Sequence, residues 1–146
     1  MTLSLRRVTD TLSVAPQIDP ADMPAIKAAG FVAIVNNRPD GEEPGQPSGD
    51  EVRAAAQAAG LAYAEVPVTH AGFSHPQLDA MAQVLEADGP VLAYCRSGTR
   101  SCNLWALAEA KGGADPEALT RDAAAAGYDL SAIRPLLDAL SGGARG

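Results

Sequence analysis

Apolar positions along the chain form two kinds of pattern, and turn residues separate one from the next. Short, mainly apolar runs, which are typical of strands in a parallel sheet, occupy residues 12–14, 31–35, 61–66 and 91–94. Apolar residues at helical spacing predict helices over residues 23–29, 51–59, 78–85, 101–111, 116–126 and 131–140. Glycine or proline stands at many of the boundaries, where it ends a helix or a strand.

The order of these elements predicts the fold class. Strands that alternate with helices imply parallel strands joined by right-handed crossovers, with helices on both faces of the sheet. The chain of 146 residues is expected to form a single α/β domain over residues 1–140, with a mostly parallel sheet of four to five strands. Residues 141–146, SGGARG, are expected to form a flexible tail.

Ligands of such sheets bind beyond the carboxyl ends of the strands. Three loops leave those ends, over residues 36–50, 67–76 and 95–100. The first contains three prolines and three glycines, and a loop of this length is uncommon in a compact domain unless it is functional or disordered. We therefore expect the functional site where the three loops meet.

The composition excludes several classes of protein. The chain carries 11 basic and 18 acidic side chains, and its net charge of −7 argues against a nucleic-acid partner, which normally requires a basic face. No apolar run approaches the ~20 residues of a membrane span, and residues 1–11 lack the apolar stretch of a secretory signal. A cytoplasmic protein without membrane association is therefore expected.

The two cysteines are separated by six residues. This number and spacing are typical neither of a disulfide scaffold nor of a metal site, so no metal and no other cofactor is expected. The second cysteine, Cys102, lies inside a predicted helix and is interpreted as a buried core residue.

The segment CRSGTRS, residues 95–101, carries the most specific chemistry in the sequence. A thiol at the start of a helix faces unpaired N–H groups and the positive end of the helix dipole, so Cys95 is the candidate nucleophile. Gly98 allows successive N–H groups to turn inward as an anion-binding nest. Arg100 offers a planar set of donors for an oxyanion, and the Ser101 hydroxyl is expected to donate to the sulfur. The sulfur is expected at the mouth of this narrow ring, and the residues expected to bind the anion are Arg96, Ser97, Gly98 and Thr99.

Charged residues on the other two loops complete the predicted site. Asp40 is the candidate general acid, and Glu42 and Glu43 beside it share that possibility, although such charges also serve to repel unwanted anions or are simply solvated. Arg38 either binds the far end of an anionic substrate or pairs with one of these carboxylates. His70 is a candidate catalytic acid, a hydrogen-bond donor to substrate or a brace for its loop.

Two parts of the sequence resemble known families. CRSGTRS resembles the active-site loop of rhodanese-type sulfurtransferases. The segments NNRPDGEE, VPV and AYCRSGTRSCNLWAL resemble the β-lactamase hydrolase-like proteins, phosphatase-like domain family, over residues 1–112. This second resemblance implies a dual-specificity-phosphatase-like fold, and either sulfur transfer or phosphatase activity.

The departures from the phosphatase pattern favour sulfur transfer. Tyrosine phosphatases have five residues between the cysteine and the arginine, whereas four separate Cys95 from Arg100, and Tyr94 stands where a histidine is common. The loop that holds their catalytic aspartate corresponds to residues 67–76, which contain no carboxylate. The shorter loop gives a smaller ring of N–H groups, and sulfur transfer needs less help from a general acid than ester hydrolysis does. Both features suit a persulfide on Cys95, which forms from thiosulfate or another persulfide and transfers its outer sulfur to a thiol.

Two other functions remain open. The first alternative is a phosphatase that hydrolyses a phosphate ester through a phosphocysteine at the same Cys95. The second is a non-catalytic module that uses the loop only to bind an anion.

Overall fold

The computed structural model describes residues 4–69 and 71–145, and these form a five-stranded sheet flanked by helices. The strands are β1 (Arg6–Arg7), β2 (Leu12–Ala15), β3 (Ala33–Asn36), β4 (Ala62–Glu65) and β5 (Val91–Tyr94). The helices are η1 (Pro20–Asp22), α1 (Met23–Ala28), α2 (Gly49–Ala58), α3 (His75–Val84), α4 (Thr99–Lys111), α5 (Pro116–Ala125), η2 (Ser131–Ile133) and α6 (Arg134–Arg145).

The sheet has the order β1-β2-β5-β3-β4, and the four strands from β2 to β4 in this order are parallel. This confirms the predicted single α/β domain with a mostly parallel sheet. Strand β1 was not predicted; it pairs antiparallel with β2, Arg6 lying opposite Val14. It is two residues long and exposed, so it has no apolar pattern from which sequence analysis recognises a strand.

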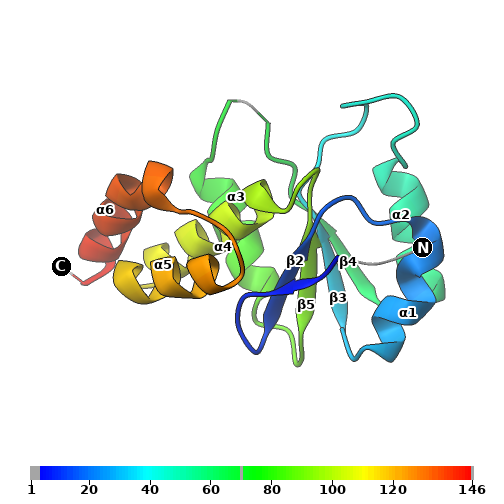
Figure 1. Cartoon of the computed structure of the whole chain (residues 1–146), viewed down its shortest axis with the longest axis horizontal. Helices are drawn as coiled ribbons and strands as arrows, with labels where there is room; N and C mark the ends of the chain where they lie inside the picture. Colours follow the sequence, from blue (N-terminus) through cyan, green and yellow to red (C-terminus); the bar gives the residue numbers. More distant parts are fainter. Residues whose placement is uncertain (1–3, 70, 146) are drawn as a thin grey trace.

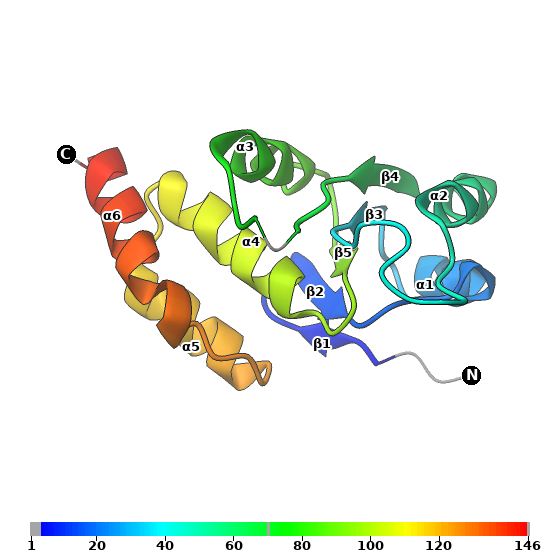
Figure 2. The same cartoon turned by 90° about the horizontal axis from the view of Figure 1, so that it is seen from above.

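Helices cover both faces of the sheet (Figures 1 and 2). Alternate side chains of one strand enter opposite layers: in β3, Ala33 and Val35 belong to the core with α3 and α4, whereas Ile34 belongs to the core with α1 and α2. This alternation follows from the two-residue period of a strand. Helices α5 and α6 pack on the outer side of α4 (Figure 2).

The last helix is longer than the sequence predicts. Helix α6 continues to Arg145, beyond Leu140, where the predicted helix ends. Ser141 is buried, and its hydroxyl donates to the carbonyl of Ala114 at 2.9 Å. This hydrogen bond joins the segment that was expected to be a flexible tail to the connection between α4 and α5.

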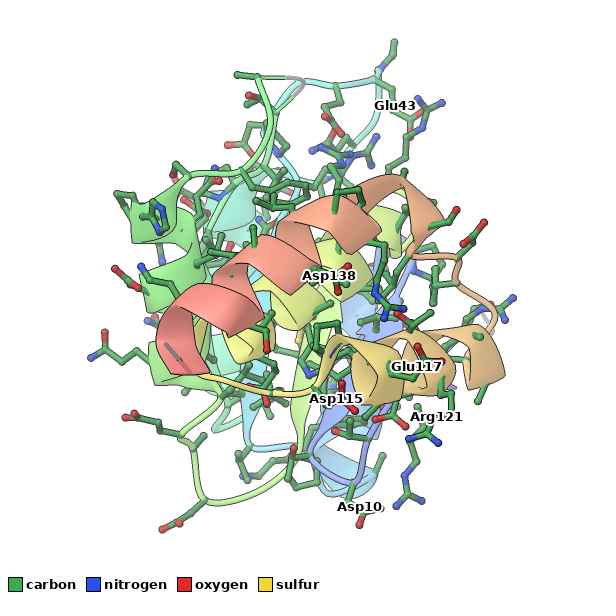
Figure 3. All side chains as sticks on the ribbon, turned by 90° about the vertical axis from the view of Figure 1, so that its left-hand side faces the viewer. Asp10, Glu43, Asp115, Glu117, Arg121 and Asp138 are labelled. Atoms are coloured by element: carbon green, nitrogen blue, oxygen red, sulfur yellow. The ribbon has the colours of Figure 1, made fainter. Side chains whose placement is uncertain are left out.

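Acidic side chains are spread over the surface. Figure 3 shows Asp115, Glu117 and Asp138 at the end of the molecule formed by α5 and α6, and Glu43 on the loop between β3 and α2.

Within the described ranges, no helix is both long and apolar enough to cross a membrane. Within the same ranges, no three His, Cys, Asp or Glu side chains are grouped so that they could hold a metal ion.

Three loops meet at the carboxyl edge of the parallel strands, as the sequence predicts (Figure 1). We call residues 37–48, between β3 and α2, the acidic loop, and residues 95–100, after β5, the cysteine loop. The register of the sheet places Asn36 opposite Tyr94, and the N–H of Asn37 donates to the carbonyl of Tyr94 at 2.8 Å. The two loops therefore leave the sheet side by side.

Candidate active site

Cys95 follows the last residue of β5 and lies at the base of the site. Its N–H donates to the carbonyl of Ala15 at 3.3 Å, which continues the pairing of β5 with β2. The N–H of Gly98 donates to the Cys95 sulfur at 3.1 Å. This N–H therefore points inward, as the predicted anion-binding nest requires.

The start of α4 supplies further backbone donors after Gly98. The first N–H groups of a helix have no partner within the helix. Here the N–H of Thr99 bonds to the hydroxyl of Ser97 at 3.4 Å, whereas those of Arg100 and Ser101 have no acceptor among the described residues. Gly98 has a φ of 92°, which an L-residue rarely adopts, and this conformation turns the chain into the helix.

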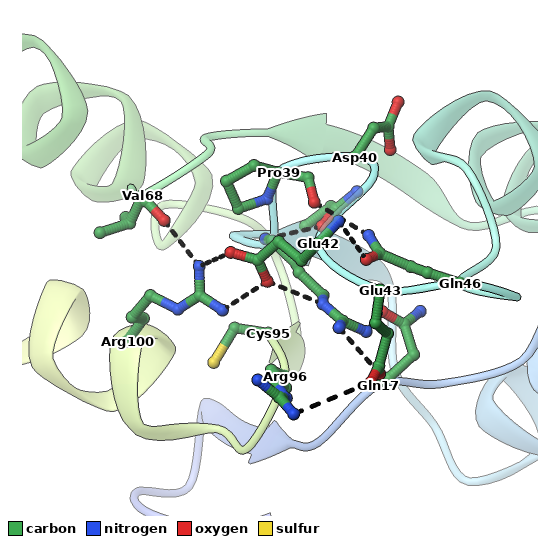
Figure 4. Close-up of polar contacts among 12 residues, drawn as sticks. Gln17, Pro39, Asp40, Glu42, Glu43, Gln46, Val68, Cys95, Arg96 and Arg100 are labelled. Carbon is green, nitrogen blue, oxygen red and sulfur yellow. Dashed lines mark hydrogen bonds and ion pairs between the residues drawn. The ribbon is translucent and has the colours of Figure 1, made fainter. Parts of the chain in front are cut away.

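Cys95 has no exposed surface. The expectation that its sulfur lies at the mouth of the ring is therefore wrong for this conformation. In Figure 4 the guanidinium of Arg100 and the carboxylate of Glu42 lie above the Cys95 side chain, and the sulfur points away from Glu42. These two side chains belong to α4 and to the acidic loop, so their ion pair joins distant parts of the chain at the site.

Arg100 has two bidentate edges, and one of them is occupied. Its Nη1 donates to Glu42 Oε2 at 2.8 Å and to the Val68 carbonyl at 2.7 Å, and its Nη2 donates to Glu42 Oε1 at 2.8 Å. A guanidinium has five N–H donors, so Glu42 and Val68 leave the Nε–H and one Nη2–H unused. These two donors lie on one edge, which faces the Cys95 sulfur in Figure 4. Hydrogen bonding to Glu42 and, to a smaller extent, to Cys95 raises the pKa of Arg100, although burial acts in the opposite direction.

Glu42 is held between two arginines. Its Oε1 accepts from Arg38 Nε at 2.8 Å as well as from Arg100. Hydrogen bonds from Arg100, and then from Arg38, lower the pKa of Glu42 from 4.5 to about 2, although partial burial acts in the opposite direction. Glu42 is therefore ionised at neutral pH and fixes the orientation of Arg100.

Arg38 is among the largest fully buried side chains of the described residues. Besides Glu42, it donates to Glu43 Oε1 at 2.9 Å and to Gln17 Oε1 at 3.0 Å. A buried cation requires such partners. Of the two roles considered for Arg38, pairing with carboxylates is therefore the one that the structure shows, and its guanidinium organises the acidic loop.

Asp40 does not face the sulfur. Its Oδ1 accepts from the N–H of Gly49 at 2.8 Å, at the start of α2, and its side chain points away from Cys95 in Figure 4. A carboxylate at a helix N-terminus is stabilised by unpaired N–H groups. In this conformation the prediction that Asp40 is a general acid is wrong, and Asp40 instead fixes the end of the acidic loop.

Ser101 departs from its predicted contact. Its hydroxyl is buried and has no hydrogen-bond partner among the described residues, so the expected hydrogen bond to the sulfur is absent from this conformation. A buried hydroxyl without a partner is costly, and an acceptor brought into the site would satisfy it. The prediction for His70 lies outside the described residues.

The remaining predicted anion-binding side chains point outward. Arg96, Ser97 and Thr99 are exposed, and Arg96 Nη2 lies 3.8 Å from Glu43 Oε2. Among these residues the backbone, rather than the side chains, is placed to bind an anion. Cys102 is buried as predicted, and burial raises the pKa of its thiol to about 12, so it is protonated at neutral pH.

We expect Glu42→Gln to lower the free energy of unfolding at pH 7 by about 1–3 kcal/mol, because it leaves two arginines with a weaker partner. A carboxyl group whose pKa is lowered on folding stabilises the protein above its unfolded pKa, and this contribution is lost as the pH falls toward the folded value. The difference in the free energy of unfolding between wild type and variant should therefore shrink as the pH falls from about 5 to about 2. Urea unfolding at several pH values measures this difference.

Glu43→Gln is the matched control for this prediction. The Glu43 carboxylate contacts Arg38 and lies 3.8 Å from Arg96 Nη2, and it is half exposed, so solvent weakens both ion pairs and its removal should cost less than that of Glu42. Equal losses for the two variants would contradict the central position assigned to Glu42.

Both the sequence and the structure of the chain are similar to those of known proteins. The sequence model of the family "Beta-lactamase hydrolase-like protein, phosphatase-like domain" matches residues 4–112. The Beta-lactamase hydrolase-like protein of Agrobacterium fabrum is 44% identical over 108 residues, which make up 73% of this chain and 25% of that protein. A "putative phosphatase" from Neisseria meningitidis has a crystal structure with a TM-score of 0.80 and 34% identity, covering 92% of this chain and 96% of that one.

A more distant structure shows the same fold. P. aeruginosa TpbA, solved in complex with pTyr, has a TM-score of 0.64 and 16% identity, and the match covers 97% of this chain and 90% of that one. The architecture is thus a dual-specificity-phosphatase-like fold, as the resemblance implied. Its cysteine and arginine stand at the carboxyl edge of the sheet, which defines a phosphatase-like, anion-binding cysteine site.

The chain belongs to the family of Beta-lactamase hydrolase-like proteins, phosphatase-like domain. It spans about a quarter of the length of the curated relatives that it matches. The names of the related structures support the phosphatase alternative better than the sulfurtransferase interpretation. The short cysteine loop, which had favoured sulfur transfer, is therefore insufficient evidence for that reaction.

Proposed function

We propose that the protein is a cysteine-dependent phosphatase that hydrolyses aryl phosphate monoesters through a phosphocysteine at Cys95. The observation that carries this proposal is the convergence of donors on one sulfur. The Gly98 N–H points to the Cys95 sulfur, and the edge of Arg100 that Glu42 does not occupy faces it from α4. Donors placed in this way on a phosphatase-like fold suit a phosphoryl group.

The reaction proceeds in two displacements. The Cys95 thiolate attacks phosphorus, so that an S–P bond forms while the P–O bond to the leaving group breaks and its electron pair remains on that oxygen. Water then attacks phosphorus and the S–P bond breaks, which releases phosphate and restores the thiolate. The N–H groups of the cysteine loop and the free edge of Arg100 bind the non-bridging oxygens in both steps.

The carboxylates of the acidic loop explain why an aryl ester is proposed. Glu42 is ionised because its pKa is about 2, Glu43 is paired with Arg38, and Asp40 bonds to Gly49. None of the three is therefore placed to protonate a leaving oxygen. A phenolate leaves with less help from an acid than an alkoxide does, and His70 stays a candidate for what help is needed.

The substrate class agrees with one related structure. P. aeruginosa TpbA, which shares the fold, binds pTyr, and phosphotyrosine is an aryl phosphate. Because Cys95 is fully buried here, binding also requires that the side chains covering the sulfur shift when the phosphoryl group enters.

Mass spectrometry of the intact protein distinguishes the possible reactions. The wild-type protein is mixed separately with an aryl phosphate, thiosulfate and polysulfide, and is acid-quenched within one turnover. A phosphocysteine adds ~80 Da and a persulfide ~32 Da, as expected for these covalent intermediates. The proposal predicts the larger adduct on the peptide that contains Cys95, together with release of phosphate.

Two outcomes would overturn the proposed function. A persulfide adduct with sulfur transfer to a thiol, and no phosphate release, would establish the sulfurtransferase instead. Binding of phosphate without any adduct or turnover would leave only the anion-binding module.

A further inference from the structure

The peptide unit between Ser97 and Gly98 is held at both of its edges. Its N–H, which belongs to Gly98, donates to the Cys95 sulfur at 3.1 Å. Its carbonyl, which belongs to Ser97, accepts from the hydroxyl of Tyr128 at 3.3 Å. A trans peptide is planar, with the carbonyl oxygen and the N–H on opposite edges, so the Tyr128 hydroxyl and the Cys95 sulfur fix the same plane from two sides.

Tyr128 lies in the connection between α5 and η2, and its position is itself fixed. Its N–H donates to the Ala123 carbonyl at 2.9 Å. Arg6, on strand β1, places its guanidinium 5.8 Å from the centre of the Tyr128 ring and donates to the Ala126 carbonyl at 3.1 Å. The ring is thus held between the N-terminal strand and the turn that follows α5.

The fit between Tyr128 and the cysteine loop is close. A Cβ atom added at Gly98 would overlap the Tyr128 hydroxyl. Gly98 also has a φ of 92°, and glycine passes between positive and negative φ more freely than any other residue. Without an outer hydrogen bond, this peptide could therefore rotate, which would turn a carbonyl oxygen toward the sulfur in place of the N–H.

We propose that Tyr128 is a positioning residue that holds the Ser97–Gly98 peptide with its N–H toward Cys95. Tyr128 acts through the peptide, because its hydroxyl contacts the Ser97 carbonyl rather than the sulfur. An N–H directed at the sulfur stabilises a thiolate, whereas a carbonyl oxygen in that place would repel it. Tyr128 lies outside residues 4–112, the region that the family model matches. The inference rests on the proposed function only in assigning the thiolate a catalytic role.

Tyr128→Phe tests this proposal, since it keeps the ring beside Arg6 and removes only the hydroxyl. The rate of Cys95 alkylation by iodoacetamide is measured from about pH 5 to about pH 10, the range over which protein thiols ionise. Peptide mass spectrometry distinguishes Cys95 from Cys102. The midpoint of this profile reports ionisation, and its high-pH plateau reports access. We expect a higher midpoint, an alkylation rate near pH 6 that is about three- to tenfold slower, and a similar loss of kcat.

Ser141→Ala is the matched control. It also removes one hydroxyl that donates to a backbone carbonyl, that of Ala114, but at the far end of α6. It should lower the melting temperature about as much as Tyr128→Phe does and leave the alkylation profile unchanged.

The outcomes separate this inference from the proposed function. An alkylation midpoint in Tyr128→Phe equal to that of the wild type would overturn the positioning role, as would equal shifts in Tyr128→Phe and Ser141→Ala. A shift in Tyr128→Phe alone would support it. Failure of the wild type to release phosphate would contradict only the proposed function, because alkylation requires no turnover.

Discussion

Replacing Cys95 with serine is expected to lower phosphate release from an aryl phosphate by about 10⁴-fold or more. A serine hydroxyl is protonated at neutral pH, and no carboxylate among the described residues forms a hydrogen bond with the Cys95 side chain from which it could accept that proton. The N–H groups of the cysteine loop are unchanged in this variant, so phosphate should still bind. Steady-state kinetics and isothermal titration with inorganic phosphate measure the two effects.

Cys102→Ala is the control for this variant. Cys102 is buried in α4 and is protonated at neutral pH, since its pKa is about 12. Its replacement should reduce stability slightly and leave turnover within a small factor of wild type. Turnover that survived in Cys95→Ser but was lost in Cys102→Ala would show that the wrong cysteine has been assigned as nucleophile.

Arg100→Lys is expected to lower kcat/KM by about 10²- to 10³-fold, the loss that follows removal of a donor to developing charge. The guanidinium bonds to Glu42 through one edge and leaves the Nε–H and an Nη2–H for the phosphoryl oxygens. An ammonium group has no second planar edge, so a lysine that pairs with Glu42 cannot bind the substrate in the same way. Kinetics with an aryl phosphate measure the loss.

Arg134→Lys provides the comparison. Arg134 pairs with Glu117 and Asp138 at the surface formed by α5 and α6, and the same change of side chain there should leave kcat/KM unaltered. If Arg100→Lys behaved like Arg134→Lys, the free edge of Arg100 would have no role in binding substrate.

The sheet and its helices follow from local patterns, which explains why most of them are predictable. The apolar runs that became β3 and β5 are buried on both faces of the sheet, so burial and sequence carry the same signal. Strand β1 and the last turns of α6 have no such signal, because they are fixed by one pairing with β2 and by the contact of Ser141 with Ala114.

Parts of the candidate site likewise follow from local sequence, and other parts depend on contacts between distant residues. The cysteine, the glycine and the arginine are close in sequence and their arrangement follows from a strand that runs into a helix. The position of Glu42 depends instead on how the acidic loop folds around Arg38, and sequence analysis singled out Asp40, whose side chain bonds to Gly49 instead. The contact of Tyr128 with Ser97 joins residues 31 positions apart, and nothing in either segment indicates it.

The ion pairs of the site also determine how strongly it attracts a charged ligand from a distance. Arg38, Arg96 and Arg100 face Glu42, Glu43 and the thiolate proposed for Cys95, so the positive and negative charges cancel. The whole chain carries a charge of −7. Such a protein has no long-range attraction for an anion. Recognition must therefore begin only after close approach, and a phosphorylated segment flanked by lysines or arginines would arrive faster than a bare phosphate ester.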